Sequence, residues 1–461
     1  MSHYERYHIP TQPAPHLRNH PSRFRVKVSR PKLASLLVRE VIHYRGDMDV
    51  VLSRPCVYGV FSGPVGGFAP RDSLCVGCLR CTVQYPDMVT IEPNPARLSL
   101  GDSYISPDQV DTILYEASTG RVPVKGAGYR GAYGGDGWDG MWTDMSEIVR
   151  PTRDGIHGRE YISTAIDLGA PPARLSFAAD GGPQSRLDRL ISLPVPFLLD
   201  APPAAASEPS YLRALVLAAE AIESLVVLPW KTIADHGIHS ESVVPIVSPS
   251  DLASLRASMR TFKVVELVEA DPQALASIRA AQPGVVIGLR SGYPVNGPSL
   301  VRAGWDFLHL TADYHGHTPD GFVLDAIQSV HQELVDAGVR SHFTLVGSGG
   351  IAAAEHVPKA IIAGLDVVGL DTPLLLAVQA VFDGEVIDPE HAALVMPALD
   401  QQWAAQRMIN LAGSWRDQLL EIMGAMGLRE VRRLRGEIGR AMFQTELERD
   451  AFAGIEGYPN G

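Results

Sequence analysis

Four cysteines are the residues of this sequence whose type and spacing point most directly to a chemistry. The chain of 461 residues contains only these four, and all fall within one stretch of 26 residues: Cys56, Cys75, Cys78 and Cys81. Thiols gathered in this way favour a metal centre over a disulfide framework. The C-x2-C-x2-C spacing of the last three is the core of the motif that binds a [4Fe–4S] cluster in ferredoxins. The sequence therefore predicts an iron–sulfur centre in this stretch.

The fourth ligand of this cluster is predicted to be Cys56. A ferredoxin motif ends with one more cysteine before a proline, and that cysteine binds the other cluster of a two-cluster protein. Here Tyr85 stands in that place before Pro86, and Cys56 lies 19 residues ahead of Cys75, about the separation found in two-cluster ferredoxins. At the positions where the other motif would have its remaining three cysteines, this sequence has Gly46, Asp49 and Leu52. Compared with a two-cluster ferredoxin, this sequence is thus expected to lack one cluster together with all its ligands. The other cluster is expected to keep its four cysteine ligands.

The sequence is also compatible with other metal contents of the cysteine site. Four thiolates are also enough for structural zinc, although zinc sites usually pair C-x2-C units instead of placing three cysteines in one run. A three-iron centre and an empty site are the remaining alternatives. Because one cluster carries one electron at a time, a second redox centre is expected close by.

The sequence pattern changes near residue 194, where the elements that would position this chemistry begin. From there, short apolar runs alternate with helical stretches, and Ser250 and Asp271 are predicted helix N-caps. Eight such units predict a parallel (β/α)8 barrel, with a doubly wound open sheet as the alternative. The predicted strands cover 195–199, 225–228, 243–247, 264–268, 285–289, 307–311, 343–346 and 366–370.

Composition and these patterns divide the chain into five parts. It is 46% hydrophobic and 20% charged with a net charge of -12, which is globular and argues against nucleic acid as the main partner. No apolar run is long enough for a membrane span and no signal peptide is evident, so a cytoplasmic location is expected. The predicted parts are an arm with a short helix (1–49), a ferredoxin-like module (50–95), a linker with covering loops (96–190), the barrel (191–400) and C-terminal helices (401–461).

A glycine-rich turn after the seventh predicted strand is the candidate phosphate site. VGSGGI at 346–351 ends this strand and opens a helix, where backbone N–H groups favour an anion. Barrels commonly bind phosphates on the loops after strands 7 and 8. Beside an electron relay the expected ligand is FMN, because a flavin converts single electrons into two-electron chemistry; a tight turn without ligand is the alternative. The predicted binding residues are Ser348, Gly349, Gly350, Gly369, Asp371 and Thr372.

Polar residues at the predicted rim are the candidates for catalysis. Asp313, His315 and His317 follow the sixth strand, and Arg290 ends the fifth, on the side of a barrel that carries chemistry. Asp313 and His315 are expected to transfer protons, and Arg290 to stabilise negative charge on a substrate or a reduced flavin. The D-x-H-x-H spacing is also that of metal ligands. A polar rim loop and a rim salt bridge are the structural alternatives.

Three segments resemble the glutamate synthase family. Residues 330–377 are similar to the FMN-phosphate half of its synthase-domain barrel, 410–436 resemble the helical segment that follows, and LPVPFLLDAPP (193–203) matches the start of its first strand. The cysteine module resembles the N-terminal extension of archaeal-type glutamate synthase subunits. The resemblance implies an FMN enzyme that reduces the imine formed from 2-oxoglutarate and ammonia, with electrons supplied through an iron–sulfur centre.

The sequence also departs from that family. TADYHGHTPDG (311–321) stands where the family has a glycine-rich segment, and Asp371 stands where the family has glycine before Thr372. A long K-P-G-E-G-G loop and the opening cysteine of a glutaminase domain are missing from the sequence. A separate glutaminase or electron-donor subunit is therefore the expected partner.

Together these features predict a two-module redox protein. One [4Fe–4S] cluster passes electrons to FMN in the barrel, where an imine or a keto- or amino-acid-like substrate is reduced. The alternative is a non-catalytic electron-transfer or scaffold subunit of a larger complex, with a degenerate barrel. The missing glycine-rich segment and the carboxylate at Asp371 favour this alternative.

Overall fold

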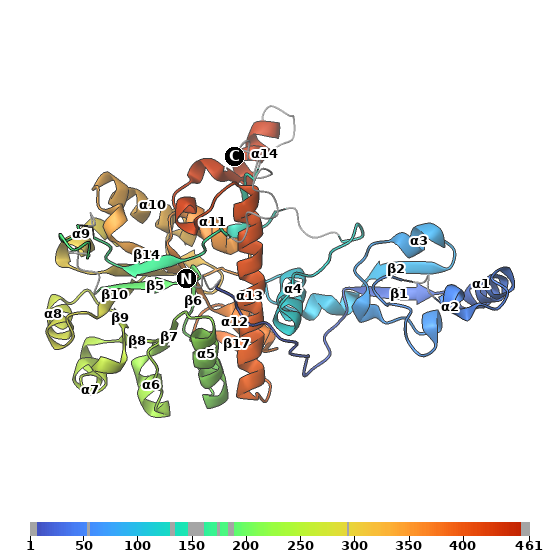
Figure 1. Ribbon diagram of the computed structural model, residues 1–461, viewed down its shortest axis with the longest axis horizontal. Coiled ribbons are helices and arrows are strands. Elements are labelled where there is room, and N and C mark those ends of the chain that lie inside the picture. The colour runs from blue at the N-terminus through green and yellow to red at the C-terminus, as the bar shows by residue number, and fades with distance from the viewer. Residues whose placement is uncertain are drawn as a thin grey trace.

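The main body of the protein is a closed barrel of eight parallel strands (Figure 1). The computed structural model describes residues 7–52, 56–129, 134–145, 161–172, 176–182, 189–292 and 295–452. The barrel strands are β6 (Phe197–Leu199), β7 (Val226–Pro229), β8 (Val243–Val247), β9 (Val264–Leu267), β10 (Val286–Ser291), β11 (Phe307–Thr311), β14 (Thr344–Ser348) and β15 (Val367–Leu370). The last strand pairs with the first, so the predicted barrel is confirmed over the open sheet.

Helices follow the barrel strands and cover their outer side. Strands covered on both sides are continuous apolar runs, as in β6, where all three residues are buried. Asp271 caps its helix as predicted, but Ser248 replaces Ser250 as the cap of the turn before α7. The helices are α5 (Pro209–Ala221), α6 (Trp230–His236), α7 (Leu252–Leu255), α8 (Pro272–Ala281), α9 (Gly297–Ala303), α10 (Val323–Asp336), α11 (His356–Ala363) and α12 (Thr372–Ala377).

A small module projects from one side of the barrel (Figure 1). Its sheet pairs β1 (Phe24–Val28) antiparallel with β2 (Val89–Pro93), and α1 (Arg30–His43), α2 (Met48–Leu52) and α3 (Arg80–Gln84) complete it. The strand β1 lies in the segment predicted as an arm. Its FRVKV sequence alternates buried and exposed side chains, but five residues are too short a run to be distinguished from irregular chain.

The chain reaches this module from the barrel and returns to it. Before β1, the Tyr7 hydroxyl donates to the Ile222 carbonyl, and Arg407 donates to the Ala14 carbonyl. After β2, α4 (Pro107–Thr119) packs against α13 (Gln401–Ala425), which also packs against α5. The segment predicted as linker and covering loops therefore contains a helix, and its start is fixed by a capping box at Ser106.

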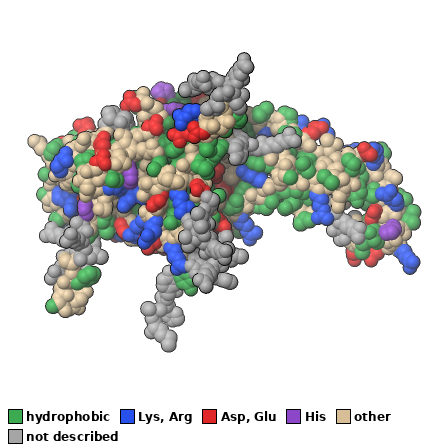
Figure 2. Space-filling view, turned by 90° about the horizontal axis from the view of Figure 1, so that it is seen from above, with side chains coloured by type: hydrophobic (Ala, Val, Ile, Leu, Met, Phe, Trp, Pro, Cys, Tyr) green, Lys and Arg blue, Asp and Glu red, His purple; other side chains and the backbone are tan. Residues whose placement is uncertain are grey.

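Short strand pairs and one more helix complete the described elements. The pairs are β3 (Met141–Thr143) with β18 (Ala441–Phe443), β4 (Ile166–Gly169) with β5 (Leu190–Leu193), β12 (His317–Thr318) with β13 (Gly321–Phe322), and β16 (Val381–Val386) with β17 (Ala392–Val395); the helix is α14 (Gln444–Phe452). Figure 2 shows charged side chains of both signs scattered over the barrel body and hydrophobic side chains prominent on the module. In the described part of the chain, no helix combines the length and the apolar character of a membrane span.

Candidate functional site

The four cysteines lie around one small cavity in the module. Cys56 follows α2, and the other three lie on the loop that leads into α3 and on that helix itself. Gly77 and Leu79 have positive φ angles of 65° and 58°, so the backbone coils left-handed on either side of Cys78. A side chain at Gly77 would stand 2.6 Å from the ring of Phe24 on β1. Glycine at this position therefore lets the cysteine loop pack directly on the sheet.

The thiols of this site are shielded from water. Burial raises the pKa of Cys75 to about 11, and the neighbouring cysteines add to the shift because adjacent thiolates would repel each other. Burial also raises the pKa of Cys81. Cys75 is buried and the other three thiols are half-buried. Thiols bind metals as thiolates, so four thiols gathered around one cavity need a cationic centre to become charged together. The donor set thus fits a metal centre.

The spacing of the sulfur atoms separates the two metal alternatives. A tetrahedral zinc ion with Zn–S bonds of about 2.3 Å brings its sulfurs to about 3.8 Å from one another. Among the described residues, the one set of three metal-binding side chains whose ligand atoms all lie within 4.8 Å of one another contains no cysteine. In a [4Fe–4S] cluster each thiolate binds a different iron, so the sulfurs stand further apart. The described cysteines therefore lack the spacing of a tetrahedral zinc site, and the [4Fe–4S] cluster stays a prediction.

The six predicted phosphate-binding residues meet where β14 and β15 end. Ser348 is in register with Gly369 on the neighbouring strand, and Asp371 and Thr372 begin α12. All six are buried, and the exposed fraction of Ser348 is only 4%. The residues are therefore brought together as predicted, but solvent does not reach them.

Two backbone donors at this site are bound inside the chain. The Thr372 N–H donates to the Asp371 carboxylate at 2.5 Å, and the Gly350 N–H donates to the Tyr314 carbonyl at 3.2 Å. The Asp371 carboxylate occupies the position at the start of α12 where a phosphate oxygen would accept a hydrogen bond. Burial raises the pKa of Asp371 to about 7.

Aromatic side chains cover the same turn. The Tyr104 hydroxyl donates to the Gly350 carbonyl at 2.7 Å, and the Trp138 indole N–H donates to the Gly349 carbonyl at 3.3 Å. Tyr314 is also buried, and its hydroxyl has no hydrogen-bond partner among the described residues. A flavin phosphate needs free donors and space. In this conformation two donors of the loops are bound inside the chain and the turn is covered, and FMN binding at this turn stays a prediction.

Arg290 lies inside the barrel mouth within a network of buried charges. It donates to both carboxylate oxygens of Asp200 at 2.9 Å and to Glu266 at 3.2 Å. The buried His309 bridges Glu266, at 2.8 Å, and the Ser348 hydroxyl, at 3.2 Å. Burial alone would raise the pKa of Asp200, but the charges of Arg290 and His309 hold it well below its usual range. The guanidinium is thus neutralised by the chain, as the salt-bridge alternative for Arg290 predicts.

His315 pairs with a carboxylate that the sequence did not reveal. Its Nε2 atom lies 3.0 Å from Asp102 and 3.9 Å from Glu385, and its ring stacks on Tyr104 with centroids 5.3 Å apart. These two carboxylates and His315 form the set within 4.8 Å mentioned above. Although burial lowers the pKa of His315, the hydrogen bond and the charge of Asp102 raise it overall. Asp102 precedes His315 by more than two hundred residues, so no local spacing could have indicated the pair.

Asp313 shapes the loop that carries His315. Its carboxylate accepts the backbone N–H groups of His315 at 3.0 Å and His317 at 2.7 Å. The His317 side chain is exposed and lies 3.8 Å from the same carboxylate. The D-x-H-x-H run therefore places only His315 in the cluster of titratable side chains at the rim. The catalytic roles of Asp313, His315 and Arg290 stay predictions.

The fold and the cysteine site together define the class of the protein as a parallel (β/α)8 barrel joined to a small four-cysteine module. Comparison with curated proteins then adds relatives named archaeal-type glutamate synthase. The protein of Dehalococcoides mccartyi is 23% identical over 79% of this chain and 86% of its own length. That of Archaeoglobus fulgidus is 22% identical over 78% and 84%. The resemblance to the glutamate synthase family is confirmed by these relatives.

Two further comparisons add little to this assignment. No family model matches the chain. Among solved structures, a mandelate oxidase variant aligns with a TM-score of 0.43 and 15% identity, covering 65% of this chain and 87% of that one. A flavocytochrome b2 variant aligns with a TM-score of 0.38 and 12% identity, covering 69% and 83%. The barrel assignment rests on the strand pairing of this chain itself.

Proposed function

We propose that this chain is a glutamate synthase-like oxidoreductase that passes electrons through one [4Fe–4S] cluster and works with partner subunits. The observation that carries the proposal is the convergence of four cysteines on one cavity. It is supported by relatives named glutamate synthase [NADPH] that align along most of the chain. The substrate that fits this kinship is an imine or a keto- or amino-acid-like compound, and a separate glutaminase or electron-donor subunit is the proposed partner.

In this proposal Cys56, Cys75, Cys78 and Cys81 bind the cluster as thiolates. The cluster supplies one-electron transfer. The chain excludes water from it with the core of the module, in which Phe24, Val26, Val60 and Val89 pack around Cys75. Gly126 and Gly128 close the loop from the other side through hydrogen bonds to Val76 and Gly77, at 2.8 and 2.6 Å. The cysteine loop is thus fixed from both sides.

The flavin is the part of the proposal that the barrel does not accommodate in this conformation. The kinship favours FMN, with Ser348–Gly350 and Gly369–Thr372 as its phosphate loops. However, Asp371 and Tyr314 each already accept a hydrogen bond from one donor of these loops, and the turn is buried beneath aromatic side chains. We therefore assign no chemical step to a flavin.

The filled barrel mouth favours a second candidate, an electron-transfer or scaffold subunit whose barrel carries no reaction. Its supporting observation is that the charged groups of the mouth, including Arg290, Asp200 and Glu266, are paired with one another. Both candidates contain the cluster, and they differ in whether the barrel carries out a reaction.

Anaerobic purification of the full chain, followed by measurement of iron, sulfide and flavin, tests the proposal and separates the two candidates. The cluster predicts about four irons and four sulfides per chain. Flavin in equal amount to the chain would favour the catalytic candidate, and iron and sulfide without flavin would favour the electron-transfer subunit. Zinc in place of iron, or no metal at all, would overturn the proposal.

A further inference from the structure

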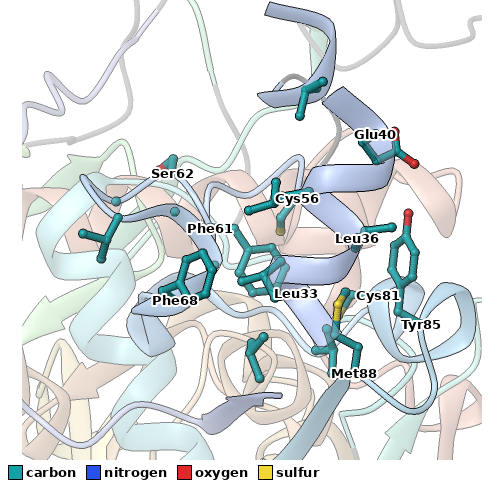
Figure 3. A pocket seen from close by; sticks show the side chains of 18 of the residues that line it. Leu33, Leu36, Glu40, Cys56, Phe61, Ser62, Phe68, Cys81, Tyr85 and Met88 are labelled. Atoms are coloured by element: carbon teal, nitrogen blue, oxygen red, sulfur yellow. The ribbon is translucent and has the colours of Figure 1, made fainter. Parts of the chain in front are cut away.

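The module contains a cavity of about 530 Å³ beside the cysteine site. This volume lies within the range of small-molecule binding pockets. Figure 3 shows Leu33 of α1 beside the ring of Phe61, and Leu36 of the same helix on the side of Tyr85; both line the cavity. The rest of the lining is also mainly apolar, with Val51, Met88 and Val89 among its residues. A ligand in this cavity would contact hydrocarbon and aromatic side chains.

The cavity shares a wall with the cysteine site. Cys56, Phe61 and Cys81 line both this cavity and the smaller one around which all four cysteines lie. Figure 3 shows the sulfur atoms of Cys56 and Cys81 at the edge of the larger cavity. A molecule bound here would therefore lie one side chain away from the proposed cluster.

The helix that forms one side of the cavity is incompletely packed. No residue of α1 is buried, although its sequence contains several leucines and valines. Leu33, Leu36 and Leu37 are half-buried because they face the cavity, whereas Val38 points outwards with an exposed fraction of 61%. A ligand in the cavity would remove apolar surface of these leucines from water.

The few polar side chains of the cavity restrict the chemistry of its ligand. Among the described residues, the lining includes the Ser62 and Tyr85 hydroxyls and the Glu40 carboxylate, and none of these described lining residues is a lysine, arginine or histidine. Figure 3 shows the Tyr85 hydroxyl directed to the side on which Glu40 lies. Among the described lining residues, a phosphate-bearing cofactor would meet an acidic group and no cation, which disfavours it. A neutral ring whose carbonyl oxygens accept hydrogen bonds from hydroxyl groups fits this lining.

A second inorganic cluster fits the cavity poorly. The only cysteines that line it are Cys56 and Cys81, which the proposed cluster already uses. Tyr85 stands where a ferredoxin-type run would supply one more thiolate.

We propose that this cavity binds a neutral quinone, beside the cysteine site and against α1. The inference rests on the proposed function, because a carrier at this place is useful only if the cysteines hold a redox centre. It gives the single cluster the neighbouring redox partner that the closed barrel mouth does not offer.

The test is equilibrium dialysis of the anaerobically purified full chain against 2,3-dimethyl-1,4-naphthoquinone, which has no free ring position for thiol addition. We expect saturable binding of one quinone per chain. Leu36→Trp, which places a larger side chain in the cavity, is expected to weaken binding about tenfold or more. Val38→Trp adds the same side chain to the outer face of the same helix and is expected to leave binding unchanged. Leu33→Phe is a smaller filling variant for the case that Leu36→Trp does not fold.

Iron content, measured on the same samples, distinguishes the two proposals. A chain with iron but no saturable quinone binding would overturn the quinone site and leave the proposed function standing. Equal binding by wild type and by a folded, iron-containing Leu36→Trp or Leu33→Phe variant would also overturn it. A chain without iron would overturn the proposed function, and the quinone site with it.

Discussion

The cysteine module and the barrel mouth differ in the room and the free groups that they offer a ligand. In the module, four thiols face one cavity and a second, apolar cavity lies beside them. At the mouth, Arg290 is bound by Asp200, and the Thr372 N–H is bound by Asp371. A side chain that already has an internal partner must give it up before it binds a ligand, which costs the interaction it leaves. The comparison favours the module over the barrel mouth as the cofactor site of the proposed function.

The largest expected effect is the loss of the cluster in Cys75→Ser. A serine hydroxyl is a poor substitute for a thiolate, so we expect iron to fall from about four per chain to less than one. Colorimetric iron and the visible absorbance of the purified protein measure this. Val57→Ser is the control, because its side chain lies next to Cys56 and is 86% exposed. Full iron content in Cys75→Ser would contradict the assignment.

At the barrel mouth, Arg290→Met is expected to destabilise the protein by about 3–5 kcal/mol, because it leaves the buried carboxylates of Asp200 and Glu266 without a cation. Urea unfolding followed by tryptophan fluorescence measures the change. Arg302→Met on the exposed surface of α9 is the matched control. A loss no larger than that of the control would show that the network does not stabilise the mouth.

Asp371→Asn is expected to change the pH dependence of stability. The carboxyl pKa is about 3.9 in an unfolded chain and is raised to about 7 in the folded protein. The folded state therefore keeps a proton that the unfolded state releases, and wild-type stability falls as pH rises through this window. The asparagine variant lacks this contribution, so its loss of stability between the two pH values should be smaller.

The measurement for Asp371→Asn is the urea midpoint of both proteins at about pH 5 and about pH 8. Burial also raises the pKa of Glu116 to about 7, but this group is present in both proteins and cancels in the comparison. Identical pH dependence in wild type and variant would mean that Asp371 is not held in its protonated form.

The smallest expected effect is that of Tyr104→Phe, which removes one hydrogen bond from the aromatic cover. The hydroxyl donates to the Gly350 carbonyl at 2.7 Å, and its loss is expected to cost about 1 kcal/mol. The same urea assay detects this, with Tyr115→Phe on α4 as the control because Tyr115 is 40% exposed. A cost below that of the control would indicate that the cover does not depend on this bond.

The barrel was predictable because its strands are apolar runs of similar length between helical stretches. β14, for example, ends at Ser348 within the glycine-rich turn, and β15 ends at Leu370, where the eighth strand was predicted to end. The strand β1 was not predictable, because FRVKV pairs with a partner about 60 residues later and carries no turn signal next to it. Long-range pairing of a short strand leaves little trace in the local pattern.

The candidate site was predictable only in part, for a similar reason. The spacing of the cysteines indicated their convergence, which the structure shows. The turn at Ser348 was also placed correctly, but its cover comes from Tyr104 and Trp138, more than two hundred residues earlier in the chain. Whether a polar group is free or already bound depends on such distant side chains, so the type and spacing of residues at the turn could not reveal it.

The route of the chain through the molecule determines how the module is attached. Residues before β1 are bound to the barrel body through Tyr7 and Ala14, and the chain comes back to that body through α4 after β2. The module is thus connected to the barrel body by two segments of chain, one before β1 and one after β2, and these two strands pair with each other. A protease that cut one connecting segment would leave the other intact. Release of the module from the barrel body would therefore require two cleavages.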